Sequence, residues 1–130
     1  MAERPAARPP AVLLTRYWLP VVAYLALIQV ASAQPDLQLP PLFPNIDKLV
    51  HVLEYLGLGV LLARAFRASL PDRAPALAAG VTITLGVILG ASDEVFQRFT
   101  PGRMSSLNDV LADATGLLFA QLIFLFVARE

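Results

Sequence analysis

The sequence has no cysteine, one histidine and one lysine, and only 15% of its 130 residues are charged. The absence of cysteine excludes a disulfide framework, a thiolate zinc site and an iron–sulfur cluster. A soluble domain usually has about 25% charged residues. The low charge, with 57% hydrophobic residues and a mean hydropathy of +0.64, therefore excludes an ordinary soluble globule, a disordered chain and a basic nucleic-acid binder. The composition predicts a small membrane protein with several spans.

Four long apolar segments lie between clusters of charge and proline. Each has about 19–21 residues, which suits a bilayer core about 30 Å thick at a helical rise of about 1.5 Å per residue. Because a backbone in lipid must satisfy its own hydrogen bonds, the predicted fold is all-α, an integral membrane bundle of four transmembrane helices. A cytoplasmic tail (1–16) precedes a transmembrane domain (17–130), with predicted spans at 17–35, 47–66, 74–92 and 108–128.

Most of the eleven prolines lie outside these spans. Segment 34–45 is expected to be extended. Pro101-Gly102 is expected to form a tight turn in which the glycine supplies a positive φ. Pro20 falls in the first turn of the first span, where a missing N–H costs little.

The charges are divided unequally between the two ends of the predicted bundle. With the N-terminus in the cytoplasm, the inner side has seven basic and three acidic residues, a net charge of +4. The outer side has three basic and seven acidic residues, a net charge of −4. The positive-inside rule thus predicts an N-in, C-in protein. The inner basic residues are Arg4, Arg8, Arg16, Arg64, Arg67, Arg73 and Arg129, and the outer ones are Lys48, Arg98 and Arg103.

A cleaved signal peptide is the alternative for the first span. Three arginines precede an apolar stretch that ends in Ala31-Ser32-Ala33, which matches an A-x-A cleavage pattern. The stretch is longer than a typical signal-peptide core. Cleavage would leave three spans and would not change the sidedness of the rest, and mass spectrometry of the mature N-terminus decides it.

The orientation is testable with reporter fusions. Fusions in the loop before Leu49 and in the loop at Gly102 are expected to report the outer side of the membrane, because the acidic residues gather there. If both loops were found in the cytoplasm, the predicted orientation would be wrong.

Most of the acidic residues fall in three short stretches, at 47–55, 93–99 and 101–116. Within the first, Asp47, His51 and either Glu54 or Tyr55 recur at the spacing of one helix face. In the four-span topology the three stretches meet at the outer side, where their polar groups can satisfy one another. The predicted polar site is Asp47, Lys48, His51, Glu54, Tyr55, Glu94, Gln97, Arg98, Arg103, Asp109 and Asp113. The predicted turn and packing residues are Pro101, Gly102, Gly116, Gly86 and Gly90.

Several of these residues also have a purely structural interpretation. Asp47 is placed to be the N-cap of its helix. Ser106 and Asp109 have the S-x-x-D spacing of a capping box. Asp93 and Arg98 are placed to be solvated at the membrane interface.

The remaining ionisable residues divide into two groups. Lys48 can extend its ammonium to the interface, and a lone His51 is more often hydrogen-bonded than a metal ligand. Glu54, Glu94 and Asp113 are functional candidates, because ionisable groups inside a membrane are costly.

Common catalytic motifs are missing: the sequence has no Walker-type phosphate loop, no H-E-x-x-H and no G-x-S-x-G. A histidine with several carboxylates can bind a divalent cation, but the spacing identifies no ligand set, so no metal or cofactor is predicted. A histidine–carboxylate pair can also perform acid–base chemistry on a phosphate ester, with Arg98 and Arg103 holding the anion.

The ordered set of polar stretches resembles the VanZ-like family of small bacterial membrane proteins. The resemblance covers about residues 45–125. One departure is Asp113, where many relatives are expected to have asparagine. The motifs that carry the resemblance are Asp47-Lys48-x-x-His51-x-x-Glu54-Tyr55, then Asp93-Glu94-x-x-Gln97-Arg98-Phe99-x-Pro101-Gly102-Arg103, and then Ser105 or Ser106, Asp109 and Gly116.

The resemblance implies a multi-pass protein of the bacterial inner membrane, and the family's namesake is linked to low-level teicoplanin resistance. The acids gathered with Arg98 and Arg103 at the outer side leave three functional hypotheses open. The first is a protein whose outward polar site binds a membrane lipid, a lipid-linked cell-wall precursor or a lipoglycopeptide. The second is a membrane-embedded enzyme acting on a lipid phosphate or ester, with His51, Glu54 and Glu94 as acid–base or metal-binding candidates. The third is a polar cluster that only holds the helices together. The oligomeric state is not predicted.

Overall fold

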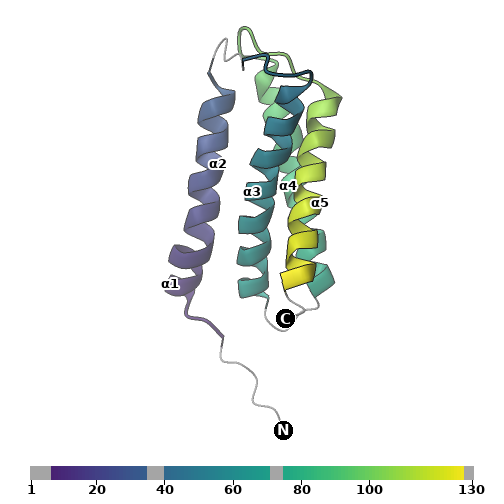
Figure 1. Cartoon of the computed structure of the whole chain (residues 1–130). Coiled ribbons are helices and arrows are strands. Elements are labelled where there is room, and N and C mark those ends of the chain that lie inside the picture. The colour runs from purple at the N-terminus through teal and green to yellow at the C-terminus, as the bar shows by residue number, and fades with distance from the viewer. Residues whose placement is uncertain (1–6, 35–39, 71–74, 128–130) are drawn as a thin grey trace.

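The structure is a computed structural model, and it describes residues 7–34, 40–70 and 75–127. The first span consists of α1 (Pro10–Val12), a π-helical segment η1 (Leu13–Trp18) and α2 (Leu19–Ser32). It is followed by α3 (Ile46–Ser69), α4 (Pro75–Gln97) and α5 (Leu107–Val127). Four helices are long and apolar enough to cross a membrane, so the predicted all-α bundle of four membrane helices is confirmed (Figure 1).

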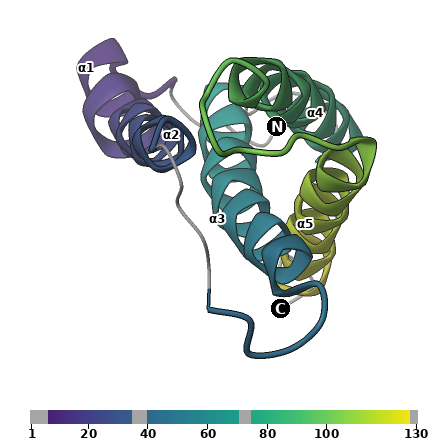
Figure 2. The ribbon, with the colours of Figure 1, turned by 90° about the horizontal axis from the view of Figure 1, so that it is seen from above.

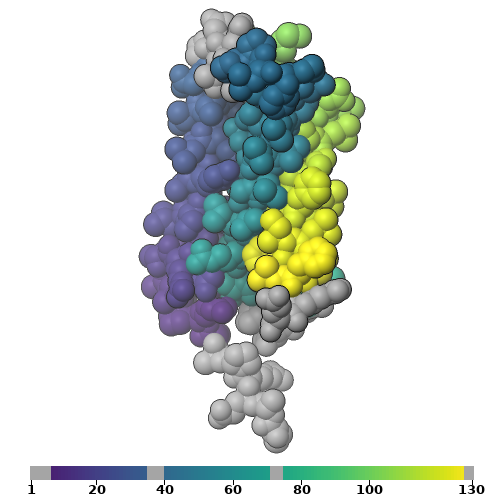
Figure 3. Space-filling view, in the orientation of Figure 1, coloured from purple at the N-terminus to yellow at the C-terminus, as the bar shows by residue number. Residues whose placement is uncertain are grey.

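Helices α3, α4 and α5 form a three-helix bundle, and the first span lies at its side (Figure 2). Space filling shows a long molecule in which the first span occupies one flank (Figure 3). Residues 40–45, which precede α3, and the loop that joins α4 to α5 lie at one end, and α1 lies at the other (Figure 1). The three polar stretches are therefore brought to the same end of the molecule.

The close approach of the bundle helices depends on glycine. A Cβ on Gly116 of α5 would lie 2.3 Å from the carbonyl oxygen of Val52 in α3. A Cβ on Gly86 of α4 would lie 2.5 Å from the Leu117 side chain of α5. Since there is no hydrophobic driving force between helices in lipid, close packing of this kind is a main source of the energy that holds the helices together.

The first span is fastened to α3 by aromatic residues. Trp18 donates a hydrogen bond from Nε1 to Oγ of Ser69 at 3.0 Å, and its ring meets that of Phe66 edge to face at 5.1 Å. Tyr24 donates its hydroxyl to the Glu54 carbonyl at 3.0 Å. The polar tips of these side chains are thereby satisfied within the protein.

The helices differ from the predicted spans in their bounds. The first begins at Pro10 rather than residue 17, so Pro20 lies within a longer helical span, just after the π-helical segment. The third continues to Gln97 rather than residue 92, because Asp93, Glu94 and Gln97 are buried against the protein and do not face lipid. The second starts after Asn45, whose φ is 61°, so the N-cap interpretation of Asp47 is wrong.

The connections are partly as expected. Residues 40–45 contain bends and a turn rather than a fully extended strand. The Pro101-Gly102 turn is present, with Gly102 at a φ of 75° and a hydrogen bond from the Arg103 N–H to the Thr100 carbonyl. Proline followed by a positive-φ glycine is typical of a type II turn. Residues 1–6, 35–39, 71–74 and 128–130, which include parts of the predicted tail, connections and charge distribution, lie outside the described residues.

Replacing Gly116 by alanine is expected to destabilise the bundle. The new Cβ would overlap backbone atoms of α3, which cannot move aside as a side-chain end can, and overpacking costs about 1–3 kcal/mol. Gly80→Ala is the matched control, because a Cβ there meets nothing within 4 Å. Thermal unfolding in detergent should show a lower midpoint for Gly116→Ala alone. Equal midpoints would contradict close α3–α5 packing at this position.

Candidate functional site

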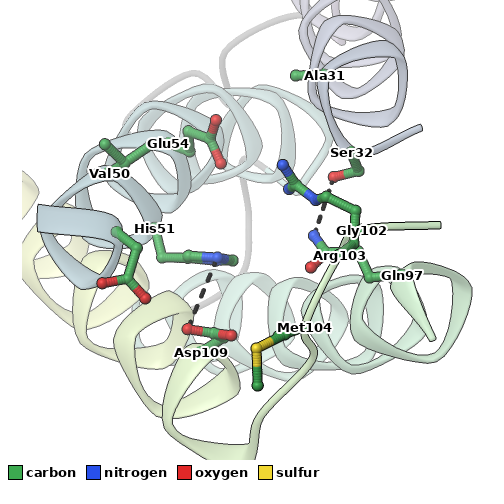
Figure 4. A pocket seen from close by; sticks show the side chains of 11 residues that line it. Ala31, Ser32, Val50, His51, Glu54, Gln97, Gly102, Arg103, Met104 and Asp109 are labelled. Carbon is green, nitrogen blue, oxygen red and sulfur yellow. Dashed lines mark hydrogen bonds and ion pairs between the residues drawn. The ribbon is translucent and has the colours of Figure 1, made fainter. Parts of the chain in front are cut away.

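A pocket of about 370 Å³ opens at the end of the molecule where the polar stretches meet. Its walls come from the last turn of α2, the first turns of α3 and α5, the end of α4 and the α4–α5 loop. His51, Glu54 and Arg103 point into the same space (Figure 4). The lining residues are Ala31, Ser32, Asp47, Val50, His51, Glu54, Gln97, Gly102, Arg103, Met104 and Asp109.

The imidazole of His51 is held by a buried carboxylate. Its Nδ1 lies 2.8 Å from Oδ1 of Asp113, a residue with an exposed fraction of 0%. An ionised carboxylate only accepts hydrogen bonds, so with Asp113 ionised it is Nδ1 that donates the hydrogen. The other nitrogen, Nε2, lies 3.8 Å from Oδ1 of Asp109 at the pocket wall (Figure 4). His51 is therefore close to two carboxylates. These neighbours favour an acid–base role for the histidine over a structural role in which it is hydrogen-bonded only to the backbone.

Lys48 joins the beginnings of α3 and α5. Its ammonium contacts Oδ1 of Asp109 and lies 2.6 Å from Oδ2 of Asp47. Asp47 is largely exposed, whereas Asp109 is buried. The lysine thus compensates the charge of Asp109, the buried member of the pair, because a buried charge without a partner is costly.

The predicted capping box at Ser106 is formed with a different acid. The Ser106 hydroxyl accepts the Asp109 N–H at 3.3 Å, as the S-x-x-D spacing predicts. The Ser106 N–H, however, donates to Oε2 of Glu94 at 3.1 Å, where a capping box would use the carboxylate of Asp109. Glu94 therefore caps α5 from α4, and the Asp109 side chain is left to contact Lys48 and His51.

Glu94 and Asp113 each have one buried carboxylate oxygen without a hydrogen-bond partner among the described residues, Oε1 of Glu94 and Oδ2 of Asp113. The exposed fraction of Glu94 is 5%. One ligand atom each from His51, Glu94 and Asp109 lies within 4.8 Å of the others, so these three residues can together hold a metal ion. The sequence suggested Glu54 as the third metal-binding candidate, whereas the structure brings Asp109 to His51 and Glu94.

A second polar cluster joins α2 to α4. Asp93 accepts hydrogen bonds from Gln29 at 3.2 Å, from Ser32 at 2.7 Å and from Gln97 at 3.3 Å. Its exposed fraction is 2%, so the expectation that Asp93 is solvated at the interface is wrong. The sequence reasoning also missed Gln29 and Ser32. Their i, i+3 spacing, which places both on one face of an otherwise apolar helix, was the available signal.

The other predicted site residues have different surroundings. Glu54 is half-buried and lines the pocket, and Arg103 lines it from the loop (Figure 4). Tyr55 is completely buried in the helix core. Arg98 is exposed, does not line the pocket and donates from Nε to the Ser105 hydroxyl at 3.1 Å. A Cβ on Gly90 would lie 2.7 Å from Oδ2 of Asp113, so this glycine makes room for the buried carboxylate.

The fold and this site define a polytopic α-helical membrane protein with a polar pocket at one end of the bundle. The family model described as VanZ/LLP1 matches residues 10–128. The chain belongs to this family, and the match includes the first span, which the sequence resemblance did not cover. No curated protein and no solved structure matches the chain.

The hydrogen position on His51 can be measured directly. The chain has one histidine, so nitrogen NMR of protein labelled only in histidine observes a single imidazole. We expect hydrogen on Nδ1 in the wild-type protein and a clear change in the Nδ1 resonance in Asp113→Ala, which removes the acceptor.

Asp93→Asn is the matched control, because Asp93 bonds to Gln29, Ser32 and Gln97 and not to His51. This variant should leave the imidazole spectrum unchanged. A wild-type ring with its hydrogen on Nε2 and a bare Nδ1 would contradict the arrangement.

Proposed function

We propose that this protein binds the phosphate-bearing headgroup of an envelope amphiphile, either a membrane lipid or a lipid-linked cell-wall precursor. The observation that carries the proposal is the polar pocket at one end of a bundle of membrane helices. Ligand pockets are typically about 300–1,000 Å³, and this one, at about 370 Å³, suits one headgroup rather than a whole amphiphile.

The lining residues favour a headgroup that has a negative phosphate together with either a positive ammonium or hydroxyl groups. Arg103 offers a guanidinium, which is suited to phosphate. Glu54 and Asp47 offer carboxylates on the neighbouring wall, and these can accept hydrogen bonds from an ammonium or from sugar hydroxyls. A zwitterionic or glycosylated phosphate headgroup meets both requirements. The lipid tails would remain among the exposed apolar side chains of the helices.

The proposal places the pocket at the outer side of a bacterial inner membrane. At the opposite end, Arg8, Arg16 and Arg64 lie around the Tyr17 ring, with guanidinium carbons 4.8–5.9 Å from its centre. Arginines gathered with an aromatic ring are typical of the cytoplasmic boundary of a span. An outward pocket meets cell-wall precursors and lipoglycopeptides, which fits the resistance phenotype linked to the family's namesake.

A membrane-embedded enzyme acting on a lipid phosphate is the second candidate. The hydrogen bond between His51 and Asp113 favours it, because a carboxylate that holds Nδ1–H leaves Nε2 as a base. His51 lines the pocket, and Arg103 is placed there to hold the phosphate. The same headgroup would then be a substrate rather than a ligand.

Replacing Arg103 by glutamine is expected to weaken lipid binding by about tenfold or more, since a hydrogen bond to a charged group contributes about 1.5–3 kcal/mol. Arg98→Gln is the matched control: it makes the same change in charge at the same end of the molecule but outside the pocket. Native mass spectrometry would measure retention of phosphatidylethanolamine, phosphatidylglycerol and an undecaprenyl-diphosphate-linked sugar as separate probes.

The outcomes of this experiment separate the three hypotheses. Selective loss in Arg103→Gln supports headgroup binding, and the probe retained best identifies its source. Release of phosphate or of a shortened headgroup by wild-type protein, absent in His51→Gln, would establish the enzyme instead. If all variants retained lipid like the wild type and differed only in folded yield, the polar cluster would be purely structural.

A further inference from the structure

We propose that His51, Glu94 and Asp109 form a binding site for a divalent transition-metal ion. The three residues come from α3, α4 and α5, so the ion would join all three helices of the bundle. This inference does not depend on headgroup binding, because it concerns ligands that are already gathered within the protein.

The spacing of the three groups suits a single ion. One ligand atom from each lies within 4.8 Å of the others, and Nε2 of His51 lies 3.8 Å from Oδ1 of Asp109. Ligands bound at about 2.0–2.2 Å from an ion lie about 3–4 Å apart. Small rotations of the side chains therefore complete the coordination without any change in the helices.

The imidazole is already oriented as a ligand. Nδ1 lies 2.8 Å from Asp113 and Nε2 lies on the side of Asp109, so in the neutral ring with its hydrogen on Nδ1 the lone pair of Nε2 faces Asp109. A metal-binding histidine almost always donates its other ring N–H to a carboxylate or carbonyl, which fixes the ring and raises its basicity. Asp113 is a positioning residue in this arrangement.

Glu94 supplies the independent observation that a cation belongs here. Its carboxylate is 5% exposed, Oε2 is held by the Ser106 N–H, and Oε1 is buried with no hydrogen-bond partner in the described part of the chain. Lys48 is bonded to Asp47 and Asp109 instead. A desolvated carboxylate oxygen without compensation is costly. An ion shared with His51 and Asp109 removes that cost.

The ligand set selects the class of ion. One imidazole nitrogen with two carboxylates suits Mn²⁺, Fe²⁺ or Zn²⁺, whereas Mg²⁺ and Ca²⁺ prefer oxygen ligands alone. Two carboxylates also balance the charge of a divalent ion. Asp109 has two carboxylate oxygens, so its carboxylate can contact both the ion and Lys48. Since His51 and Asp109 line the pocket, the ion's remaining positions face that cavity.

The test uses the purified full-length protein, stripped of metal with a chelator and titrated with Mn²⁺ or Zn²⁺ without added lipid. We expect one equivalent to bind, and Glu94→Gln and His51→Gln to lower the affinity at least tenfold. Glu54→Gln is the matched control, because it removes a carboxylate of the same pocket that is outside the three-residue set. Mg²⁺ at equal concentration should not displace Mn²⁺.

Two results would overturn the proposal. One is an affinity that Glu94→Gln and His51→Gln leave unchanged; the other is an equal loss in Glu54→Gln, which would indicate nonspecific attraction to acids. If the variants do not fold, Zn²⁺ added to wild-type protein labelled in its single histidine still decides, because ligation must shift Nε2. No shift at saturating Zn²⁺ would exclude the site. Loss of lipid binding alone would leave the metal site unaffected.

Discussion

The site depends on one buried hydrogen bond, from Nδ1 of His51 in α3 to the Asp113 carboxylate in α5. This bond requires two glycines. Gly116 lets the backbones of α3 and α5 approach closely, and Gly90 leaves the space on α4 that the Asp113 side chain fills. Because Asp113 fixes the ring, Nε2 must face the pocket. The packing of small residues in the membrane therefore determines the chemistry that the histidine can perform.

The beginning of α5 also depends on a contact between two helices. A capping box that closed on itself would use the Asp109 carboxylate on the Ser106 N–H. Here Glu94 of α4 makes that bond, so a local motif becomes a contact between helices and Asp109 remains available to Lys48 and His51. The exchange also leaves Glu94 with an unpartnered buried oxygen. Ionisable groups inside a membrane are costly, so an acid retained in this state is a functional candidate.

The sequence predicted the four helices and the end at which their polar groups meet, because hydropathy and charge are properties of segments. It also predicted the Pro101-Gly102 turn, since only glycine tolerates that φ easily. It could not show that Asp93 is buried, because its partners Gln29 and Ser32 are distant in sequence. Nor could spacing separate Arg98, which faces outward, from Arg103, which lines the pocket. Which neighbour a polar group finds is decided by tertiary packing.

The Asp93 cluster explains why the first span belongs to the site. The described contacts hold the first span to the bundle by Trp18 of η1 at one end and by bonds from Gln29 and Ser32 of α2 to Asp93 at the other. Ser32 also lines the pocket, so the wall nearest α2 is fixed by a buried carboxylate. A headgroup that bonded to Ser32 or Gln97 would compete with Asp93 for the same donors. Binding of a headgroup at Ser32 or Gln97 would therefore weaken the attachment of the first span, since both would draw on one set of hydrogen bonds.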